Sequence, residues 1–376
     1  MSSIQMVDLK SQYDLIKTDV DQAIQNVIDK GAFINGPQVK EFSEALADYT
    51  GAKFVITCGN GTDALQIAMM GLGFEPGQEV IVPTFTYAAT VEVIALLGLK
   101  PKFVDVLPDT YDMDPAELEN ALGQNVVGIV PVHLYGQCTN MEFILDLANK
   151  HGVKVIEDGA QAIGAEYTFS DGRKAQAGTM GDVGTTSFFP SKNLGCYGDG
   201  GAMFTNNPIL AEKLKMIASH GQKKKYYHET IGVNSRLDTL QAAILGVKLG
   251  HLTRYSASRN EVADRYDQAL AAVSQIKIPS RIPNSTHVFH QYTIQVDGGK
   301  RDSLKTFLQD HGIPSMVYYP IPLHLQPAYV QYGYKKGDFP VAEMLCETVL
   351  SLPIHTEMDP AVQAFIIEKV KQFFAK

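Results

Sequence analysis

The chain has 376 residues, of which 45% are hydrophobic and 19% charged, and its formal net charge is −9. This length exceeds that of one simple core and predicts roughly two domains, while the negative charge argues against a nucleic-acid-binding surface. Four scattered cysteines without a CxxC pair fit the reducing cytoplasm, and no metal site is expected. No apolar run has the length of a signal-peptide core or of a membrane span, so no membrane association is expected.

The first half of the chain alternates between two periodicities of apolar residues. A period near 3.6 predicts helices over residues 11–30, 39–49, 64–72, 88–97 and 141–151. Short apolar runs predict strands over residues 53–58, 79–83, 102–106, 126–132 and 153–157. This alternation predicts an α/β fold with a mainly parallel sheet and right-handed crossovers, in which ligands bind beyond the carboxyl ends of the strands.

The second half is less regular. Glycine-rich turns are expected up to about residue 201, followed by a strand over 202–205 and a helix over 209–219. A long helical pattern covers residues 235–275. After it we expect a strand over 292–296 and helices over 303–311 and 361–374, with a proline-rich loop between these two helices. A long helix often joins a large domain to a small one. We therefore expect a large domain over residues 1–250 and a smaller α+β domain over residues 251–376. The basic run 223–225 is predicted to be a solvated loop; the alternative is that it attracts a phosphorylated ligand electrostatically.

The segment 59–64, Gly-Asn-Gly-Thr-Asp-Ala, lies between a predicted strand and a predicted helix. Backbone N–H groups at a helix N-terminus bind phosphate, and the Thr62 hydroxyl adds a donor. The segment also fits a Gly-x-Gly-x-x-Ala dinucleotide pattern, but the next strand ends at Thr84 without the acid that would bind ribose hydroxyls. Between these two ligands we favour one phosphate over a dinucleotide such as NAD; on this motif alone, a helix-capping turn with nothing bound is the first reading.

Three further candidates follow the predicted strands. Tyr87 is suited to stacking on a flat ring, or else to packing in the core. Asp158 ends an apolar strand, where a buried carboxylate is costly unless it is paired. Lys192 lies between aromatic residues and a glycine-rich turn, without charged neighbours, and desolvation there would lower its pKa and make its amine nucleophilic. The alternative for Lys192 is an ordinary surface loop.

Together these candidates match pyridoxal 5′-phosphate (PLP), which has a phosphate, a flat ring, a pyridine nitrogen and an aldehyde. Five segments then make the match specific: residues 60–65, 83–90, 157–161, 187–192 and 232–238. On these motifs the chain resembles the sugar aminotransferases of the DegT/DnrJ/EryC1/StrS family, PLP enzymes with the aspartate-aminotransferase fold (fold type I). The resemblance covers nearly the whole chain.

The resemblance implies a role for each residue at a matching position. Lys192 would bind PLP covalently and serve as general acid and base, and Asp158 would pair with the pyridine nitrogen. The other cofactor contacts would be Gln161 near the ring hydroxyl, Tyr87 stacked on the ring, and Gly61, Thr62 and Ser187 around the phosphate. Asn234 would reach the phosphate from the neighbouring subunit, which implies a homodimer with shared active sites.

Substrate contacts are expected from two regions. Arg236 would contact a substrate anion, or else be a solvated arginine at a helix start. The runs 195–201 and 319–323 look most like enzymes that aminate C3 of UDP-2-acetamido-2-deoxy-3-oxo-glucuronate with glutamate, releasing 2-oxoglutarate, for O-antigen and lipopolysaccharide synthesis. In the second run and directly beside it, Tyr318, Tyr319 and His324 are candidate contacts, and related enzymes often have His in place of Tyr318.

Other activities stay open at this point. One alternative is a C4 aminotransferase for a UDP- or dTDP-4-keto-6-deoxy sugar. A PLP-dependent sugar dehydratase would have histidine in place of Lys192, and a non-enzymatic regulator would not need the whole cofactor set. An NAD-binding protein is weakened by the missing acid.

Overall fold

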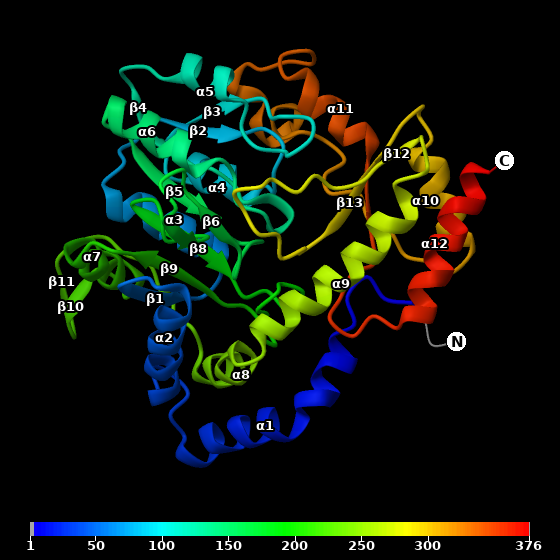
Figure 1. Ribbon diagram of the computed structural model, residues 1–376. Coiled ribbons are helices and arrows are strands. Elements are labelled where there is room, and N and C mark those ends of the chain that lie inside the picture. The colour runs from blue at the N-terminus through cyan, green and yellow to red at the C-terminus, as the bar shows by residue number, and fades with distance from the viewer. Residues whose placement is uncertain (1–3, 376) are drawn as a thin grey trace.

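The computed structural model describes residues 4–375, and residues 1–3 and Lys376 lie outside the described part. The expectation that no signal peptide is present therefore concerns a segment whose first three residues are not described. A seven-stranded sheet with the order β1-β9-β8-β5-β4-β2-β3 forms its centre (Figure 1). Its strands are β1 (Phe54–Cys58), β2 (Glu79–Pro83), β3 (Lys100–Val104), β4 (Val126–Ile129), β5 (Lys154–Asp158), β8 (Val183–Ser187) and β9 (Gly201–Thr205). The neighbours from β8 to β3 pair in parallel, whereas β9 is antiparallel to both of its neighbours. The predicted α/β fold with a mainly parallel sheet is confirmed.

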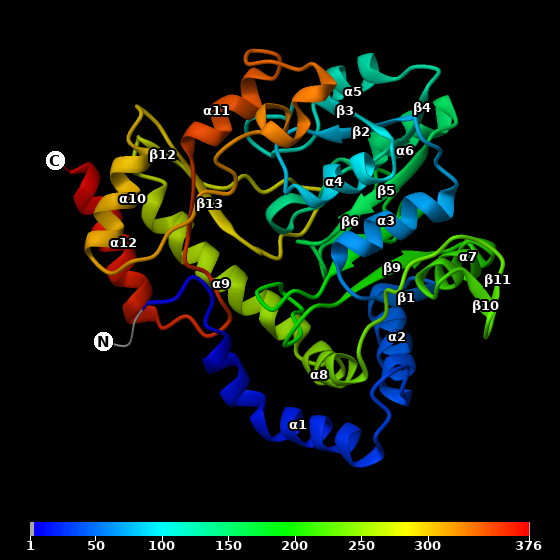
Figure 2. The same cartoon turned by 180° about the vertical axis from the view of Figure 1, so that it is seen from behind.

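Helices cover both faces of this sheet because its strands are apolar on both sides. In β2, Val80 and Val82 pack into one hydrophobic cluster while Ile81 packs into another, as expected for side chains that alternate between faces. The first face is covered by α3 (Gly61–Leu72), α4 (Ala89–Leu96) and α7 (Pro208–Ala218), and the second by α5 (Pro115–Ala121) and α6 (Met141–His151). Helices α3 and α4 lie nearer the viewer in Figure 2 than in Figure 1.

A further group of helices lies at the end of the sheet formed by β1 and β9: α1 (Leu9–Lys30), α2 (Pro37–Thr50) and α8 (Thr239–Leu249). Helix α2 packs on β1 and α8, and α1 packs on α8. Phe42 and Leu46 of α2 and Leu245 of α8 share a buried cluster with Phe188, whose ring meets that of Phe42 edge to face at 5.4 Å. This packing fixes the segment that leads to Lys192.

Helix α9 (Leu252–Leu270) runs from the large sheet to a second, three-stranded antiparallel sheet (Figure 1). That sheet consists of β12 (Ile276–Lys277), β13 (Tyr292–Val296) and β14 (Val349–Leu352), and it packs with α10 (Arg301–Asp310) and α12 (Pro360–Phe374). Leu323, Leu345 and α11 (Pro340–Thr348) pack instead into the core of the large sheet. The proposed domain boundary near residue 250 falls between α8 and α9 and stays a prediction.

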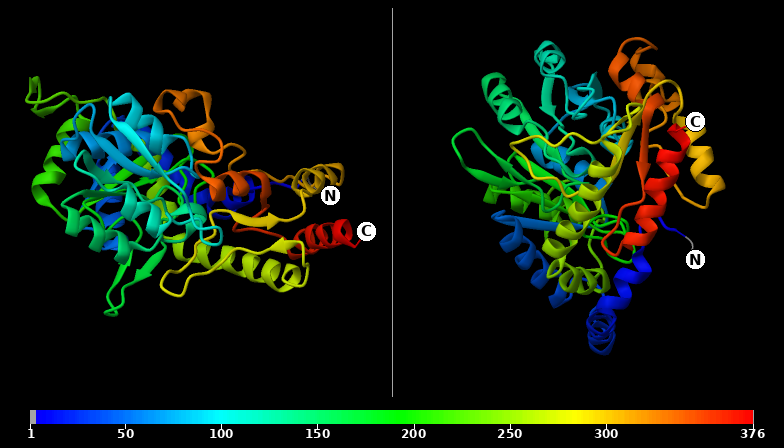
Figure 3. Two further views of the ribbon diagram at one scale, coloured as in Figure 1. Left: turned by 90° about the horizontal axis from the view of Figure 1, so that it is seen from above. Right: turned by 45° about the vertical axis from the view of Figure 1, so that its right-hand side comes forward.

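The structure corrects two expectations from the sequence. The stretch expected to hold only turns contains β8 and a hairpin of β6 (Glu166–Thr168) and β7 (Lys174–Gln176). The long helical pattern over residues 235–275 is two helices, because Gly250, a poor helix former, ends α8 and His251 starts α9. The basic run 223–225 lies on an exposed hairpin of β10 (Gln222–Lys224) and β11 (Tyr227–His228), which extends away from the body (Figure 3).

Within residues 4–375, no helix combines the length and the apolar character that a bilayer crossing would require.

Candidate active site

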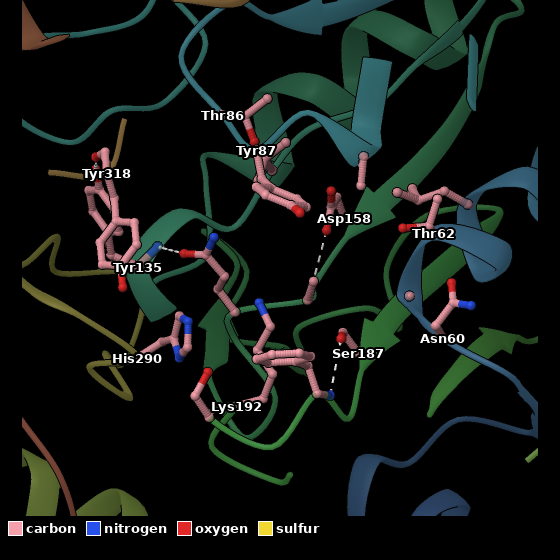
Figure 4. A pocket seen from close by; sticks show the side chains of 18 of the residues that line it. Asn60, Thr62, Thr86, Tyr87, Tyr135, Asp158, Ser187, Lys192, His290 and Tyr318 are labelled. Atoms are coloured by element: carbon pink, nitrogen blue, oxygen red, sulfur yellow. Dashed lines mark hydrogen bonds between the residues drawn. The ribbon is translucent and has the colours of Figure 1, made fainter. Parts of the chain in front are cut away.

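A cavity of about 790 Å³ opens beside the carboxyl ends of the strands in the large sheet. Its lining includes most of the residues proposed from the sequence: Gly61, Thr62, Tyr87, Asp158, Gln161, Ser187, Lys192, Tyr318 and Tyr319. They come from the starts of helices, the ends of strands and a loop of the C-terminal part of the chain, and they point into one space (Figure 4). The structure thus brings together residues that lie up to 258 positions apart in the sequence, from Gly61 to Tyr319.

The start of α3 forms one end of the cavity. Asn60 caps this helix, and its side-chain oxygen accepts a hydrogen bond from the N–H of Asp63 at 2.8 Å. A Cβ on Gly61 would lie only 2.8 Å from Cβ of Ser187, so glycine permits the backbone to approach Ser187 closely. The first N–H groups of the helix, the Thr62 side chain and Ser187 thus converge on one end of the cavity, which suits a phosphate (Figure 4).

Ser235 holds this helix start in place from a distant part of the chain. Its hydroxyl accepts a hydrogen bond from the N–H of Gly59 at 2.9 Å and donates to Asp63 at 2.6 Å. Ser235 follows Asp63 by 172 residues, so no local pattern predicts this contact, although both residues lie in segments that carry the family resemblance.

Asp158 and Lys192 supply the charges inside the cavity. Asp158 is 6% exposed; its carboxylate accepts hydrogen bonds from the Thr90 hydroxyl at 2.7 Å and from the N–H of Ala160 at 3.2 Å. Burial lowers the pKa of Lys192 to about 8, and the nearby negative charge of Asp158 opposes this shift. The Lys192 amine therefore carries a substantial neutral fraction near neutral pH.

The aromatic wall of the cavity combines residues from three loops. The Tyr87 side chain is 59% exposed, and its ring lies 6.1 Å from that of Tyr319, centroid to centroid. Gln161 donates to the Tyr319 hydroxyl at 3.1 Å and accepts from the N–H of Tyr135 at 2.8 Å. The Tyr135 hydroxyl in turn donates to the backbone carbonyl of Tyr318, which ties the two sides of the cavity together.

Glu157, the acid next to Asp158, does not line the cavity. Its carboxylate accepts three hydrogen bonds of 2.6–2.8 Å from N–H groups of residues 178–181. His133 donates from Nε2 to Glu157 at 2.9 Å, because its Nδ1 is occupied as the acceptor of the N–H of Thr139. Glu157 thus anchors the loop before β8, and Asp158 is left as the acid that faces the cavity.

Comparison with known proteins gives a match across almost the whole chain. The model of the DegT/DnrJ/EryC1/StrS aminotransferase family matches residues 14–371. The chain belongs to this family. The resemblance predicted from five sequence segments is thereby confirmed, as are an enzyme of the aminotransferase class and its PLP cofactor.

Individual members of the family are similar over their full lengths. This aminotransferase is 48% identical to UDP-2-acetamido-2-deoxy-3-oxo-D-glucuronate aminotransferase of Pseudomonas aeruginosa over 95% of its own chain and 97% of that protein. It is 46% identical to a pleiotropic regulatory protein of Geobacillus stearothermophilus over 99% of both chains. The crystal structure of DesV from S. venezuelae in complex with a ketimine intermediate superimposes with a TM-score of 0.96 at 37% identity, covering 100% of both chains.

The residues of this aminotransferase fit PLP. The helix start at Gly61 with Ser187 suits the phosphate, and the exposed face of the Tyr87 ring suits the pyridine ring. Asp158, fixed by the Thr90 hydroxyl, is available for the pyridine nitrogen, and Lys192 has no hydrogen-bond partner for its amine within residues 4–375. The assignment of these individual contacts stays a prediction.

Three of the proposed site residues do not line this cavity. Asn234 is exposed, and Arg236 lines a separate groove that also contains Lys215. His324 is fully buried, where its ring bonds to the Thr84 hydroxyl at 2.8 Å and to Glu343 at 3.2 Å. These bonds occupy both ring nitrogens of His324, so its position within one subunit gives no support to a substrate contact.

Sequence reasoning also missed several residues of the cavity lining: Asn60, Thr86, Tyr135, Asp199, His290 and Gln291. Asn60 and Thr86 stood inside motifs already quoted, so proximity to those motifs was a usable signal. The sequence contains no such signal for Tyr135, His290 and Gln291, because their positions depend on how the C-terminal segments pack against the sheet.

Proposed function

We propose that this aminotransferase transfers the amino group of glutamate to C3 of UDP-2-acetamido-2-deoxy-3-oxo-glucuronate, and that the product serves O-antigen and lipopolysaccharide synthesis. The observation that carries the reaction type is the buried Lys192 amine, with its pKa lowered to about 8, in one cavity with Asp158. The similarity to the P. aeruginosa enzyme, whose name states this keto-sugar, supports the substrate. Four free, buried cysteines support a cytoplasmic location.

Four residues of the cavity have a defined task in this reaction: Gly61, Ser187, Asp158 and Lys192. PLP, when bound, supplies an aldehyde that condenses with amines and a ring that withdraws electrons. The N–H groups at Gly61 and the Ser187 hydroxyl hold the phosphate, and Asp158 keeps a proton on the pyridine nitrogen. The neutral Nζ of Lys192 would take the proton from the α-carbon of glutamate and pass it to the cofactor. In the second half of the cycle Nζ would take a proton back from the cofactor and, as the ammonium, deliver it to C3 of the sugar.

We further propose a homodimer in which Asn234 completes the site of the partner subunit. The exposed side chain of Asn234, outside the cavity of its own chain, supports this arrangement. A mixture of Lys192→Ala and Asn234→Ala chains tests it, since a hybrid dimer then has one intact site. Random mixing makes half of the dimers hybrid, so about a quarter of the wild-type activity should return.

The matched control for this experiment mixes Lys192→Ala with Asp158→Ala. Both residues line the cavity of the same chain, so neither site of that hybrid is intact and no activity should return. Equal recovery in both mixtures would show that the sites are not shared in the proposed way. Analytical ultracentrifugation measures the dimer independently.

The substrate is tested with a panel of UDP- and dTDP-linked 3-keto and 4-keto sugars, each supplied with glutamate. We expect the fastest turnover with the UDP-linked 3-keto-uronate and a new amine at C3 by NMR. An amine at C4 of a 6-deoxy sugar would replace this proposal with the C4 alternative. A protein that forms no borohydride-fixed adduct with PLP would instead favour a regulatory role, as named for the Geobacillus relative.

A further inference from the structure

His290 lines the active-site cavity beside Lys192 and has no role in the function proposed above. The residue is only 5% exposed, and within residues 4–375 its Nδ1 atom has no hydrogen-bond partner. Leaving a buried polar nitrogen unpaired costs about 1–3 kcal/mol, so such an atom in a cavity calls for an explanation. Figure 4 shows His290 and Lys192 on the same side of the cavity.

Three contacts fix the backbone that carries His290. Arg259 donates to the carbonyl oxygens of Phe289 and His290 at 2.9 and 3.4 Å. Asn193, the neighbour of Lys192, donates to the carbonyl oxygen of Val288 at 2.8 Å. The segment before β13 is therefore attached directly to the Lys192 loop.

The third contact comes from the opposite side. Gly136 has a φ of +111°, and a Cβ there would lie 2.9 Å from the backbone nitrogen of His290. The carbonyl oxygen of Gly136 also accepts the N–H of Val288 at 2.8 Å. The backbone at His290 is thus held by the Gly136 turn and by the Lys192 loop.

Burial, together with the surrounding charges, keeps the His290 ring neutral. Burial, followed by the positive charges of Lys192 and Arg259, lowers the pKa of His290 well below its ordinary value of 6.5. A neutral imidazole has one nitrogen that accepts a hydrogen bond. An ammonium group is a donor only, and Lys192 is the cation that faces the cavity on this side.

We propose that His290 is a positioning residue for Lys192: within residues 4–375 neither the Lys192 amine nor the His290 Nδ1 has a hydrogen-bond partner, and the imidazole would accept a hydrogen bond from the amine when the amine is protonated and turns toward it. The hydrogen bond would keep Nζ near the reacting carbon between the steps of the cycle. It would also favour the protonated form of Lys192, because it is stronger to an ammonium than to a neutral amine. The inference rests on the proposed role of Lys192 in transamination.

Two substitutions and a control test this proposal. His290→Leu removes the acceptor, and His290→Asn retains one. His355→Asn is the control, because His355 is also buried, also has an unpartnered Nδ1 and also lies near Arg259, yet it does not line the cavity. The first readout is the pH dependence of PLP capture by the cofactor-free protein, and the second is the rate of a single turnover with glutamate.

His290→Leu should lower the midpoint pH of PLP capture by about one unit and slow the single turnover about tenfold or more. His290→Asn should keep the midpoint pH and the turnover rate close to the wild-type values. The control should match the wild type in both readouts. An unchanged midpoint in His290→Leu would overturn the proposal, as would a rise confined to the KM for glutamate, which would mark His290 as a substrate contact. A shift in His355→Asn as large as the shift in His290→Leu would also overturn it, since it would reflect a general perturbation.

The capture readout keeps this test separate from the proposed function. Capture requires only Lys192 and PLP, so it reports on His290 even if glutamate is not the amino donor. A wild-type protein that captures PLP but does not react with glutamate would contradict the proposed donor and leave the test of His290 intact.

Discussion

The lowered pKa of Lys192 predicts how the protein without cofactor reacts with PLP. Only the neutral amine attacks an aldehyde, so the capture rate should rise with pH and level off above the pKa of Lys192. With a pKa of about 8, about a quarter of the Lys192 amines are neutral at pH 7.5, against about one in a thousand at the ordinary value of 10.5. The structure therefore predicts a gain of roughly 240-fold in reactive amine from burial.

Asp158→Asn should move this midpoint further down. Burial lowers the pKa of Lys192, and the negative charge of Asp158 raises it, so a neutral amide at position 158 removes the opposing influence. Lys248→Met is the control: burial also lowers the pKa of Lys248 to about 8, but this lysine donates to the carbonyl of Gly195 outside the cavity.

Stopped-flow absorbance of PLP, followed from pH 6 to pH 11, measures the midpoint. Parallel reactions of PLP with a free lysine derivative correct for the titration of PLP itself. A midpoint near 10 in the wild type would refute the argument that burial activates Lys192. So would a downward shift in Lys248→Met that matches the shift in Asp158→Asn.

Three further substitutions have definite expected outcomes. Lys192→Ala should show no multiple turnovers and no borohydride-fixed cofactor by mass spectrometry. Asp158→Ala should retain PLP by absorbance but lose at least about 100-fold in turnover, and near-normal turnover would exclude its role at the ring nitrogen. Gly61→Ala should weaken PLP binding about tenfold in equilibrium titrations, because its Cβ would lie 2.8 Å from Cβ of Ser187. Gly246→Ala is its control: Gly246 lies inside α8 with nothing within 4 Å, so this change should raise the free energy of unfolding by about 0.5–1 kcal/mol and leave PLP binding unchanged.

Much of the fold followed from local periodicity. The strand over residues 79–83, the strand over 292–296 and the helix over 141–151 have the bounds that the sequence predicted. Strand β8 was missed, because Gly184 within it weakens any strand pattern, and a Cβ at Gly184 would lie 1.9 Å from the carbonyl oxygen of Gly178. The glycine is required by this close approach, which no local pattern reveals.

The site was predictable where chemistry stands in a motif at the end of a predicted strand, as for Asp158, or in a loop after one, as for Tyr87. It was not predictable where two distant segments meet. His290 and Tyr135 reach the cavity because the segment before β13 packs on the Gly136 turn, a contact between parts of the chain about 150 residues apart. Nothing in the sequence near either residue encodes this pairing.

The neighbouring acids Glu157 and Asp158 show how one residue of register decides between structure and chemistry. Adjacent side chains on a strand point to opposite faces of a sheet. In β5, Val155 packs on the face covered by α5 and α6, and Ile156 packs on the face covered by α3 and α4. Glu157 therefore shares the face of Val155 and anchors residues 178–181, while Asp158 shares the face of Ile156 and meets Thr90 of α4.

The prediction of Asp158 rested on its place at the end of an apolar strand and on the family motif, not on this register. Both faces of β5 are apolar, so hydrophobic alternation does not show which side holds the cavity. The cavity lies where the phosphate-binding start of α3 and the hydroxyl of α4 stand, and both helices cover the face of Asp158. A one-residue slip of β5 would place Glu157 in the cavity, with a longer side chain and without the Thr90 hydrogen bond that fixes the Asp158 carboxylate.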